Sequence, residues 1–167
     1  FVMFGSVLLY TGAGQAFIDL AFAAFGTIRG GPAKVAVVSS ALFGSISGSP
    51  IANVVSTGTF TIPLMKKVGY EPEYAGAVEA VASTGGQIMP PIMGAAAFIM
   101  AQSMGVPYMT IVRAAILPAF LYYFMVLISI HLVAVKGGMK GLPASQLPDF
   151  KATLKKSWFL ILPIGVL

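Results

Sequence analysis

Small, hydroxyl-bearing residues interrupt an otherwise apolar sequence at two places. The first interruption runs from Gly44 to Asn53, and the second runs from Ser83 to Pro91. Where a backbone leaves the helical conformation inside a membrane, its freed carbonyl oxygens can replace the water around a sodium ion. The N-terminus of a neighbouring half-helix offers N–H groups and a positive dipole end to an anion. The two segments are therefore candidate binding sites for a cation and an anion.

Each segment contributes side-chain oxygens together with residues that loosen the backbone. Glycine allows unusual dihedral angles and close backbone approach, and proline removes a backbone donor, which leaves an upstream carbonyl free. In the first segment the candidate residues are Ser45, Ser47, Gly48, Ser49 and Asn53. In the second they are Thr84, Gly85, Gly86, Gln87 and Pro90.

Helix packing is the alternative interpretation of the same residues. The four-residue spacing of Gly44 and Gly48 is common at contacts between membrane helices, and a serine or threonine hydroxyl often donates to a carbonyl of its own helix. Each residue taken singly fits packing as well as binding. The two segments taken together favour a transport site. Two backbone breaks at membrane depth must be buried against each other or line a polar cavity.

The composition is that of an integral membrane protein. Charged residues make up 9% of the chain and hydrophobic residues 57%, whereas an ordinary soluble domain is about 25% charged. The ten basic and five acidic residues are scattered, so the basic excess indicates membrane orientation and not nucleic-acid binding. Without cysteine, disulfides and thiolate metal sites are excluded. The chain starts at Phe1 without signal-peptide features, and both ends indicate a piece of a longer protein.

Apolar runs and turns divide the chain into six predicted parts. They are a transmembrane helix at 1–25, a re-entrant hairpin at 32–66, a discontinuous transmembrane helix at 73–104, a transmembrane helix at 108–134, a cytoplasmic loop at 135–157 and the start of another transmembrane helix at 158–167. Each hairpin arm is about 20–25 Å long as a helix, short of a full crossing. Basic residues flank the hairpin on both sides, which places both flanks in the cytoplasm.

The discontinuous helix is predicted from a proline pair. The helical pattern runs from about 74 to 84, must fail at Pro90 and Pro91, and resumes at 92. Glu79 lies inside the first half. A buried carboxylate in a membrane is a functional candidate, although Glu79 could instead pair with a basic loop residue near the surface. We expect structural or interfacial roles for Asp19, Arg113 and His131.

The two interrupted segments resemble those of a known family. The stretch from Gly44 to Lys66 is similar to the first re-entrant hairpin of the large membrane subunit of tripartite ATP-independent periplasmic (TRAP) transporters. The stretch from Val78 to Gly94 resembles the broken helix that follows the hairpin. The amino-acid sequence of the two stretches is closest to that of the subgroup whose small and large membrane subunits are fused in one chain. The resemblance implies an all-α integral membrane protein of the bacterial inner membrane, forming one half of an inverted-repeat, elevator-type transporter.

The resemblance also implies a function. It implies secondary transport of organic acids such as C4-dicarboxylates, driven by sodium as the coupling ion, with no other cofactor. A periplasmic substrate-binding protein would deliver the substrate, and a small membrane subunit would be the second partner. The implied sodium ligands are Ser45, Ser47, Gly48, Thr84 and Gly86. The second sodium site and half of the substrate contacts would lie on segments outside this sequence.

Three other classes of protein were weighed against a sodium-coupled permease. A channel also uses re-entrant loops, although a long hairpin with two helical arms fits a filter less well than a short loop. An enzyme would need a nucleophile with its base or a metal cluster, and one histidine with scattered acids does not provide either. A non-transporting assembly subunit of the same membrane fold stays open as an alternative.

Overall fold

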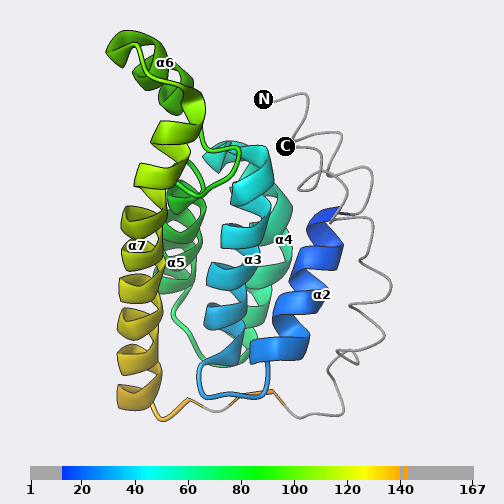
Figure 1. The fold of residues 1–167 in the computed structure, drawn as a ribbon. Coiled ribbons are helices and arrows are strands. Elements are labelled where there is room, and N and C mark those ends of the chain that lie inside the picture. Colours follow the sequence, from blue (N-terminus) through cyan, green and yellow to red (C-terminus); the bar gives the residue numbers. More distant parts are fainter. Residues whose placement is uncertain (1–12, 140, 143–167) are drawn as a thin grey trace.

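The computed structural model describes residues 13–139, 141 and 142, and this part of the chain is helical with no strand (Figure 1). Its helices are α2 (Ala13–Phe25), α3 (Gly31–Ser47), α4 (Pro50–Lys67), α5 (Pro72–Gly85), α6 (Ala95–Met104) and α7 (Tyr108–Lys136). The first twelve residues of the predicted helix at 1–25, most of the predicted loop at 135–157 and the predicted helix at 158–167 lie outside the described residues.

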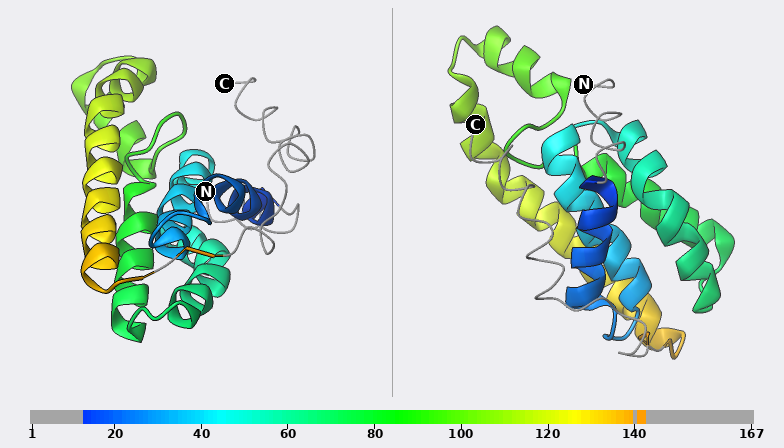
Figure 2. Two further views of the ribbon diagram at one scale, coloured as in Figure 1. Left: turned by 90° about the horizontal axis from the view of Figure 1, so that it is seen from below. Right: turned by 90° about the vertical axis from the view of Figure 1, so that its right-hand side faces the viewer.

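Helix α3 lies at the centre of the bundle. It packs against α2, α4, α5 and α7, and Figure 2 shows these helices gathered around it. Fourteen of its residues are buried, as expected for a helix that is apolar on nearly every side. The main core joins α3 to α4, α5 and α7 through buried residues that include Val37, Met65, Val78 and Tyr123.

Helices α3 and α4 form a hairpin joined only by Gly48 and Ser49. Gly48 ends α3 in the left-handed conformation, with φ of 60°. Ser49 caps α4 by accepting a hydrogen bond from the Ala52 N–H at 3.3 Å, and Pro50 takes the first helical position, where its missing N–H costs nothing. The helical hairpin spans 31–67, within one residue of the predicted bounds. Its re-entrant placement in a membrane stays a prediction.

A non-helical segment separates α5 from α6, as the proline pair predicts. The interruption is longer than expected, because α6 begins at Ala95 and not at 92. Two contacts explain the difference. The Ile92 N–H donates to the Ser45 carbonyl of the hairpin, and Met93 adopts a left-handed φ of 58°, so neither residue can join a helix.

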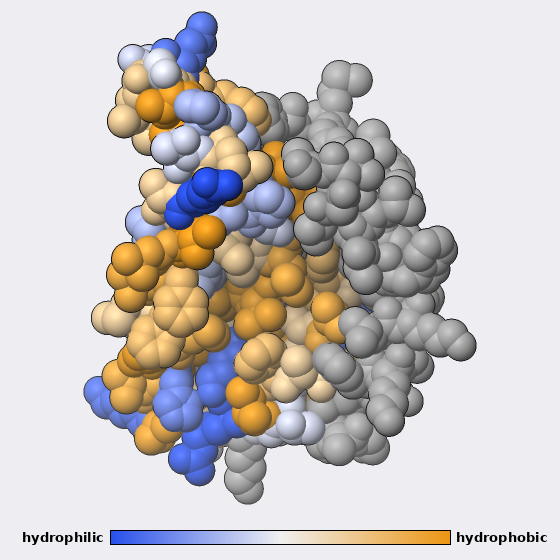
Figure 3. All heavy atoms as spheres, in the orientation of Figure 1, coloured by the Kyte–Doolittle hydropathy of each residue, from blue (hydrophilic) through white to orange (hydrophobic). Residues whose placement is uncertain are grey.

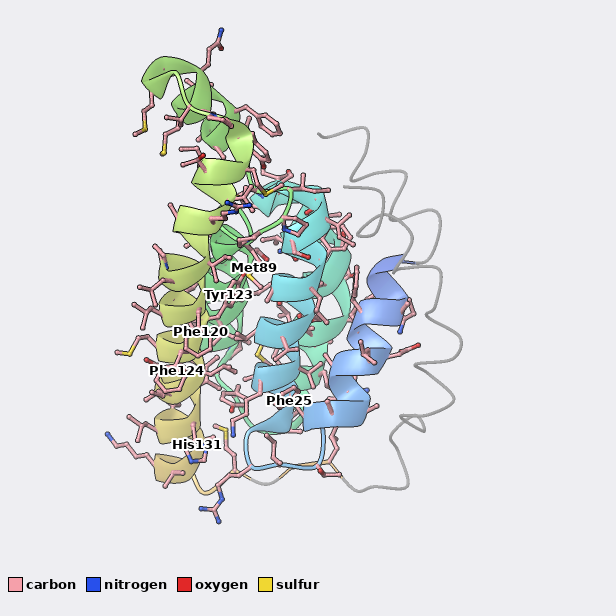
Figure 4. All side chains as sticks on the ribbon, viewed as in Figure 1. Phe25, Met89, Phe120, Tyr123, Phe124 and His131 are labelled. Atoms are coloured by element: carbon pink, nitrogen blue, oxygen red, sulfur yellow. The ribbon has the colours of Figure 1, made fainter. Side chains whose placement is uncertain are left out.

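Helix α7 is the one helix among the described residues that is long and apolar enough to cross a membrane. Its 29 residues span about 43 Å, more than the roughly 30 Å of hydrocarbon. One face packs on α3, α5 and α6, and the other exposes large apolar side chains, among them Phe120 and Phe124 (Figures 3 and 4).

Basic residues gather at one end of the bundle. Figure 1 shows that α2, α4 and α7 finish at the end where α3 and α5 begin, and hydrophilic surface collects there in Figure 3. The sequence places five basic residues at these helix ends: Arg29, Lys34, Lys66, Lys67 and Lys136. The hairpin tip and the α5–α6 segment lie toward the opposite end (Figure 1).

Candidate ion and substrate site

The two interrupted segments predicted from the sequence contact each other. The Ile92 N–H donates to the Ser45 carbonyl over 3.1 Å. A side chain at Gly48 would collide with the carbonyl group of Met93. The hairpin tip therefore lies directly on the backbone of the α5–α6 segment, so each segment covers part of the other.

A second contact joins the same two segments one turn below the tip. A Cβ atom added to Gly44 would lie 2.5 Å from the Gly86 Cα, and one added to Gly86 would lie 2.8 Å from the Gly44 Cα. Only glycine allows two backbones to come this close. Both residues are buried, so they fix the distance between the hairpin and the end of α5.

The three tip hydroxyls have different surroundings. Ser47 is fully buried, and its Oγ accepts a hydrogen bond from the Ser49 N–H at 3.5 Å. The Ser45 hydroxyl donates to the Leu42 carbonyl at 2.7 Å, and Ser49 is the cap of α4. Ser45 and Ser49 thus perform local roles of the kind that the packing interpretation describes. Ser47 is the tip hydroxyl that donates to no acceptor among the described residues.

Asn53 lies behind the contact between the two segments and not at the tip. Its side chain is fully buried, and Nδ2 donates to the Ser40 carbonyl at 2.8 Å. The same nitrogen is 3.2 Å from the position that a Gly44 Cβ would occupy and 3.3 Å from that of a Gly86 Cβ. Asn53 therefore holds the two hairpin arms together beside the glycine contact.

The second segment divides into a buried backbone and exposed side chains. Gly85 and Gly86 are buried, whereas Thr84 and Gln87 are exposed among the described residues. The Thr84 hydroxyl donates to the Ala80 carbonyl at 2.7 Å. Pro90 lines a different, smaller pocket together with Met89 and Tyr123. The structure therefore does not bring Pro90 together with Thr84 and Gln87.

A cavity of about 560 Å³ opens beside Thr84, Gly85 and Gln87. Its remaining lining comes mainly from apolar residues of α6 and α7, including Met100, Met104 and Ile111. No lysine, arginine or histidine of the described residues lines this space. An anion here would have only backbone dipoles and neutral groups of this chain as partners.

Sequence reasoning missed the part played by Met93. Its carbonyl lies against Gly48, and neither the Met93 carbonyl nor the Gly48 carbonyl accepts a hydrogen bond from any described residue. Two carbonyls without donors at the meeting point of the segments are suited to bind a cation. The left-handed backbone of Met93, which aims this carbonyl, has no signal in the sequence.

Sequence reasoning also missed the partners of Glu79. The carboxylate is fully buried and accepts hydrogen bonds from four hydroxyls: Ser40, Thr57, Thr61 and Ser83. It pairs with no basic residue in the part of the chain that the structure describes, whereas one interpretation of the sequence allowed a basic loop partner. The spacing could have indicated this cluster, since residues four apart share one helix face. Thr57 and Thr61 have this spacing, as do Glu79 and Ser83.

Among the described residues, no hydrogen bond joins Asp19, Arg113 or His131 to the two segments. Asp19 accepts a hydrogen bond from Gln15 at 2.8 Å, and Arg113 is exposed. His131 Nδ1 lies 3.0 Å from the Lys34 ammonium, which donates to it. This contact ties the end of α7 to the start of α3 (Figure 4), so His131 has a structural partner that the sequence did not reveal.

The fold and the site together define a class of protein. Helices α2, α3, α4, α5 and α7 pack in one bundle, α6 packs on α7, and α7 is suited to a bilayer. The hairpin tip contacts the α5–α6 segment at one end of the bundle. Among the described residues this is an all-helical organisation with one helix long and apolar enough to cross a membrane. Residues 1–167 match the family model described as "Tripartite ATP-independent periplasmic transporter, DctM component". The chain belongs to this family, whose members are transporters and not enzymes.

Curated relatives carry names from the same family. The chain is 31% identical over 171 residues to "C4-dicarboxylate TRAP transporter large permease protein DctM" of Vibrio cholerae, covering 100% of this chain and 37% of the relative. Identity to the protein of the same name from Pseudomonas aeruginosa is 29%, covering 100% and 39%. Identity to "Sialic acid TRAP transporter large permease protein SiaM" of Vibrio cholerae is 23%, covering 100% and 39%. The chain thus spans about two fifths of the length of these relatives.

Proposed function

We propose that the chain is one half of a large permease subunit in a sodium-coupled, binding-protein-dependent secondary transporter for organic acids. The observation that carries the proposal is the contact between the hairpin tip and the α5–α6 segment, through Ser45 with Ile92 and Gly44 with Gly86. Irregular backbone at membrane depth persists only where it is buried in protein or lines a polar cavity. Two such segments that cover each other meet this condition.

The membrane placement follows from the helix ends. With the basic end of the bundle in the cytoplasm, the hairpin α3–α4 enters and leaves on that side as a re-entrant element. Helices α5 and α6 then form one discontinuous membrane helix, and α7 returns to the cytoplasm. The location is the bacterial inner membrane, and the hairpin with the discontinuous helix forms the moving part of an elevator-type transporter.

The sodium site lies where the tip meets the second segment. Ser47 supplies a buried hydroxyl oxygen, and the Gly48 and Met93 carbonyls supply oxygens that accept no hydrogen bond among the described residues. Gly86 supplies backbone one turn below, at its contact with Gly44. Ser45 and Thr84 contribute the free lone pairs of hydroxyls whose protons are already donated to helix carbonyls. Uncharged oxygens of this kind suit a hard monovalent cation.

The substrate class and the partners rest on the relatives. Their names include C4-dicarboxylate and sialic acid permeases, and both substrates are organic acids. We infer a periplasmic substrate-binding protein and a small membrane subunit as partners, the latter fused in the complete protein. None of the described residues that line the apolar cavity beside Gln87 is cationic, so further contacts to the acid come from the rest of the full-length subunit.

The experiment is uptake of a C4-dicarboxylate into proteoliposomes that contain the full-length permease and its binding protein. We expect uptake to require an inward sodium gradient and the binding protein. Ser47→Ala should raise the sodium concentration needed for half-maximal uptake. Ser39→Ala is the matched control, because Ser39 is a buried serine of the same helix whose hydroxyl bonds to the Val35 carbonyl at 2.7 Å.

The other outcomes of this experiment identify the alternatives. Uptake that is unchanged in sodium-free buffer would contradict sodium coupling. Flux that does not saturate and needs no binding protein would indicate a channel. Absence of any uptake by a correctly folded, fully assembled complex would indicate an assembly subunit.

A further inference from the structure

Glu79 holds a carboxylate at the centre of a cluster of hydroxyls that the transport site does not use. Its side chain is 0% exposed. The Thr61 hydroxyl lies 2.5 Å from Oε2, the Thr57 hydroxyl contacts Oε1, and two longer contacts to Oε1 come from Ser83 at 3.3 Å and Ser40 at 3.4 Å. The cluster therefore joins both hairpin arms to α5.

The Glu79 carboxylate lies apart from the proposed sodium site. Glu79 precedes Gly85 by six residues, which is about 9 Å along a helix, and Ser40 and Thr57 lie on the hairpin arms below the tip. Among the described residues, no hydrogen bond joins the Glu79 carboxylate itself to Ser47, Gly48 or Gly86. The nearest link is through backbone, where the Ser83 carbonyl accepts from the Gly86 N–H at 3.1 Å.

No cation compensates the Glu79 carboxylate among the described residues. Its interactions are burial and the four hydroxyl contacts alone. The helices packed against α5 are α3, α4 and α7, and none of their charged or titratable side chains bonds to Glu79. These are Lys34 on α3, Lys66 and Lys67 on α4, and Tyr108, Arg113, Tyr122, Tyr123, His131 and Lys136 on α7. The other titratable groups of α5 are the exposed Glu73 and the half-buried Tyr74.

A buried carboxylate without a cation is strongly disfavoured. Removing an ion from water costs several kcal/mol even after the protein relaxes, and four neutral hydroxyls offset only part of that cost. A group in this position therefore binds a positive charge. The choice lies between a metal ion and a proton.

The spacing of the oxygens favours a proton. Thr61 and Thr57 hydrogen-bond directly to the carboxylate oxygens, so no ion stands between these oxygen atoms. Oxygens that share one metal ion at more than 2 Å stand farther apart, because the ion lies between them. The cluster is closed on itself and needs no space for an added atom.

The hydroxyls can satisfy the carboxyl group in both protonation states. A hydroxyl has one proton to donate and two lone pairs. Thr61 has a second acceptor, the Thr57 carbonyl at 3.0 Å, and Thr57 has the Asn53 carbonyl at 2.9 Å. When Glu79 is ionised, both threonines donate to it. When it is neutral, its O–H donates to the Thr61 oxygen, and Thr61 donates to the Thr57 carbonyl.

We propose that Glu79, enclosed by Ser40, Thr57, Thr61 and Ser83, is a proton-binding site between the hairpin and α5, separate from the sodium site at the tip. The step is transfer of one proton from hydronium to a carboxylate oxygen, giving the carboxylic acid and water. With the proton bound, the hairpin arms close on α5. Loss of the proton leaves a charge at this contact, which favours separation of the hairpin from α5 and entry of water.

The test is infrared difference spectroscopy of the purified full-length protein at neutral pH. We expect a C=O stretching band of a buried carboxylic acid that disappears in Glu79→Gln. In Thr61→Val the band should shift to higher frequency, because one hydrogen bond to the carboxyl group is lost. Thr59→Val is the matched control and should leave the band unchanged, since Thr59 is exposed and bonds to the Ser56 carbonyl.

The Thr61→Val shift keeps the proposal testable even where Glu79→Gln does not fold. A band that persists in Glu79→Gln, or that does not move in Thr61→Val, would show that Glu79 is not the protonated group. A band that disappears on adding sodium at constant pH would show that a metal ion occupies the cluster, and it would overturn the proposal. Neither readout depends on transport, so the sodium-coupling proposal can fail independently.

Discussion

Gly48 is the residue on which the contact between the two segments depends most directly. Its φ of 60° lies in the left-handed region, and the Met93 carbonyl occupies the place of a side chain. Two separate constraints therefore require glycine at this position. Gly105 shares the first constraint with φ of 64° but has open space around it.

Replacing Gly48 should be more costly than replacing Gly105. We expect Gly105→Ala to lower the free energy of unfolding by about 1–2 kcal/mol, the cost of the left-handed conformation. Gly48→Ala should lower it further, because the Met93 backbone must move. The measurement is unfolding of the purified full-length protein in detergent. Equal losses in the two variants would mean that the tip does not pack on Met93.

Among the described residues, Tyr70 has a buried hydroxyl group without a hydrogen-bond partner. Its ring stacks on Tyr74 at 5.7 Å, in the connection between α4 and α5. Burial raises the pKa of Tyr70 to about 12. The neutral phenol therefore contributes stability below pH 10 that is lost as the pH rises through about 12.

Tyr70→Phe should stabilise the protein, by up to about 1–3 kcal/mol, since an unpaired buried hydroxyl is removed. Its stability should also fall less than that of the wild type between pH 10 and pH 12. Unfolding at neutral and alkaline pH measures both effects, with Tyr74→Phe as the control on the stacked ring. A loss of stability in Tyr70→Phe at neutral pH would contradict this account, because it would reveal a partner for the hydroxyl.

At the residue scale, the sequence predicted which residue types gather at the tip but not what each one does. Ser45 and Thr84 donate to carbonyls of their own helices, a choice that depends on local rotamers. The Glu79 cluster depends on three helices coming together, which no single helical pattern specifies. Ser47 and Gly48 lie where the sequence places them, and their binding of sodium stays a prediction.

At the scale of elements, two tyrosines of α7 form hydrogen bonds to backbone carbonyls of α5. The Tyr123 hydroxyl donates to the Ala82 carbonyl at 3.0 Å in a buried position. The Tyr122 hydroxyl donates to the Val81 carbonyl at 2.7 Å on the exposed side. The two rings also flank Gly85, where a Cβ atom would come within 2.5 Å of Tyr122.

The two hydrogen bonds should contribute differently to stability, because one is buried and the other is exposed. Tyr123→Phe should lower the free energy of unfolding by about 0.5–1.5 kcal/mol, because a buried hydrogen bond is removed without changing the ring. Tyr122→Phe, the matched control, should cost less, because the Val81 carbonyl is already paired within α5 and lies at the surface. Unfolding of the two variants measures the difference, and a larger loss in Tyr122→Phe would contradict it.

The helical elements were largely predictable, because prolines and glycines mark their ends. Pro50 and Pro72 begin helices, and Gly48 ends one. The start of α6 was predicted three residues early. It depends on the hydrogen bond from Ile92 to Ser45, which is a contact between segments nearly fifty residues apart. A local pattern contains no information on such a contact.

For the whole molecule, the proposed topology places both ends of the hairpin on one side of the membrane. Arg29 lies before α3, Lys67 ends α4, and both are exposed. Ser103 lies at the far end of α6 and is also exposed. The sequence given has no cysteine, so single cysteines can be introduced here once any others in the full-length protein are removed.

Single cysteines at these positions should react with a maleimide from the side of the membrane on which they lie. In oriented membrane vesicles, an impermeant maleimide should label Arg29→Cys and Lys67→Cys from the cytoplasmic face, since basic flanks stay inside. It should label Ser103→Cys from the opposite face. Labelling of the two hairpin flanks from opposite faces would mean that the hairpin crosses the membrane, and the re-entrant assignment would be wrong.

Sodium binding at the contact between the hairpin tip and the α5–α6 segment is the central claim, and calorimetric titration of sodium into the purified full-length protein tests it most directly. The account predicts saturable binding that potassium does not reproduce. Ser47→Ala should weaken it about tenfold or more, a loss of roughly 1.4 kcal/mol, and Ser39→Ala should leave it unchanged. Binding of equal strength in the wild type and in Ser47→Ala, or no sodium-specific binding at all, would contradict the account.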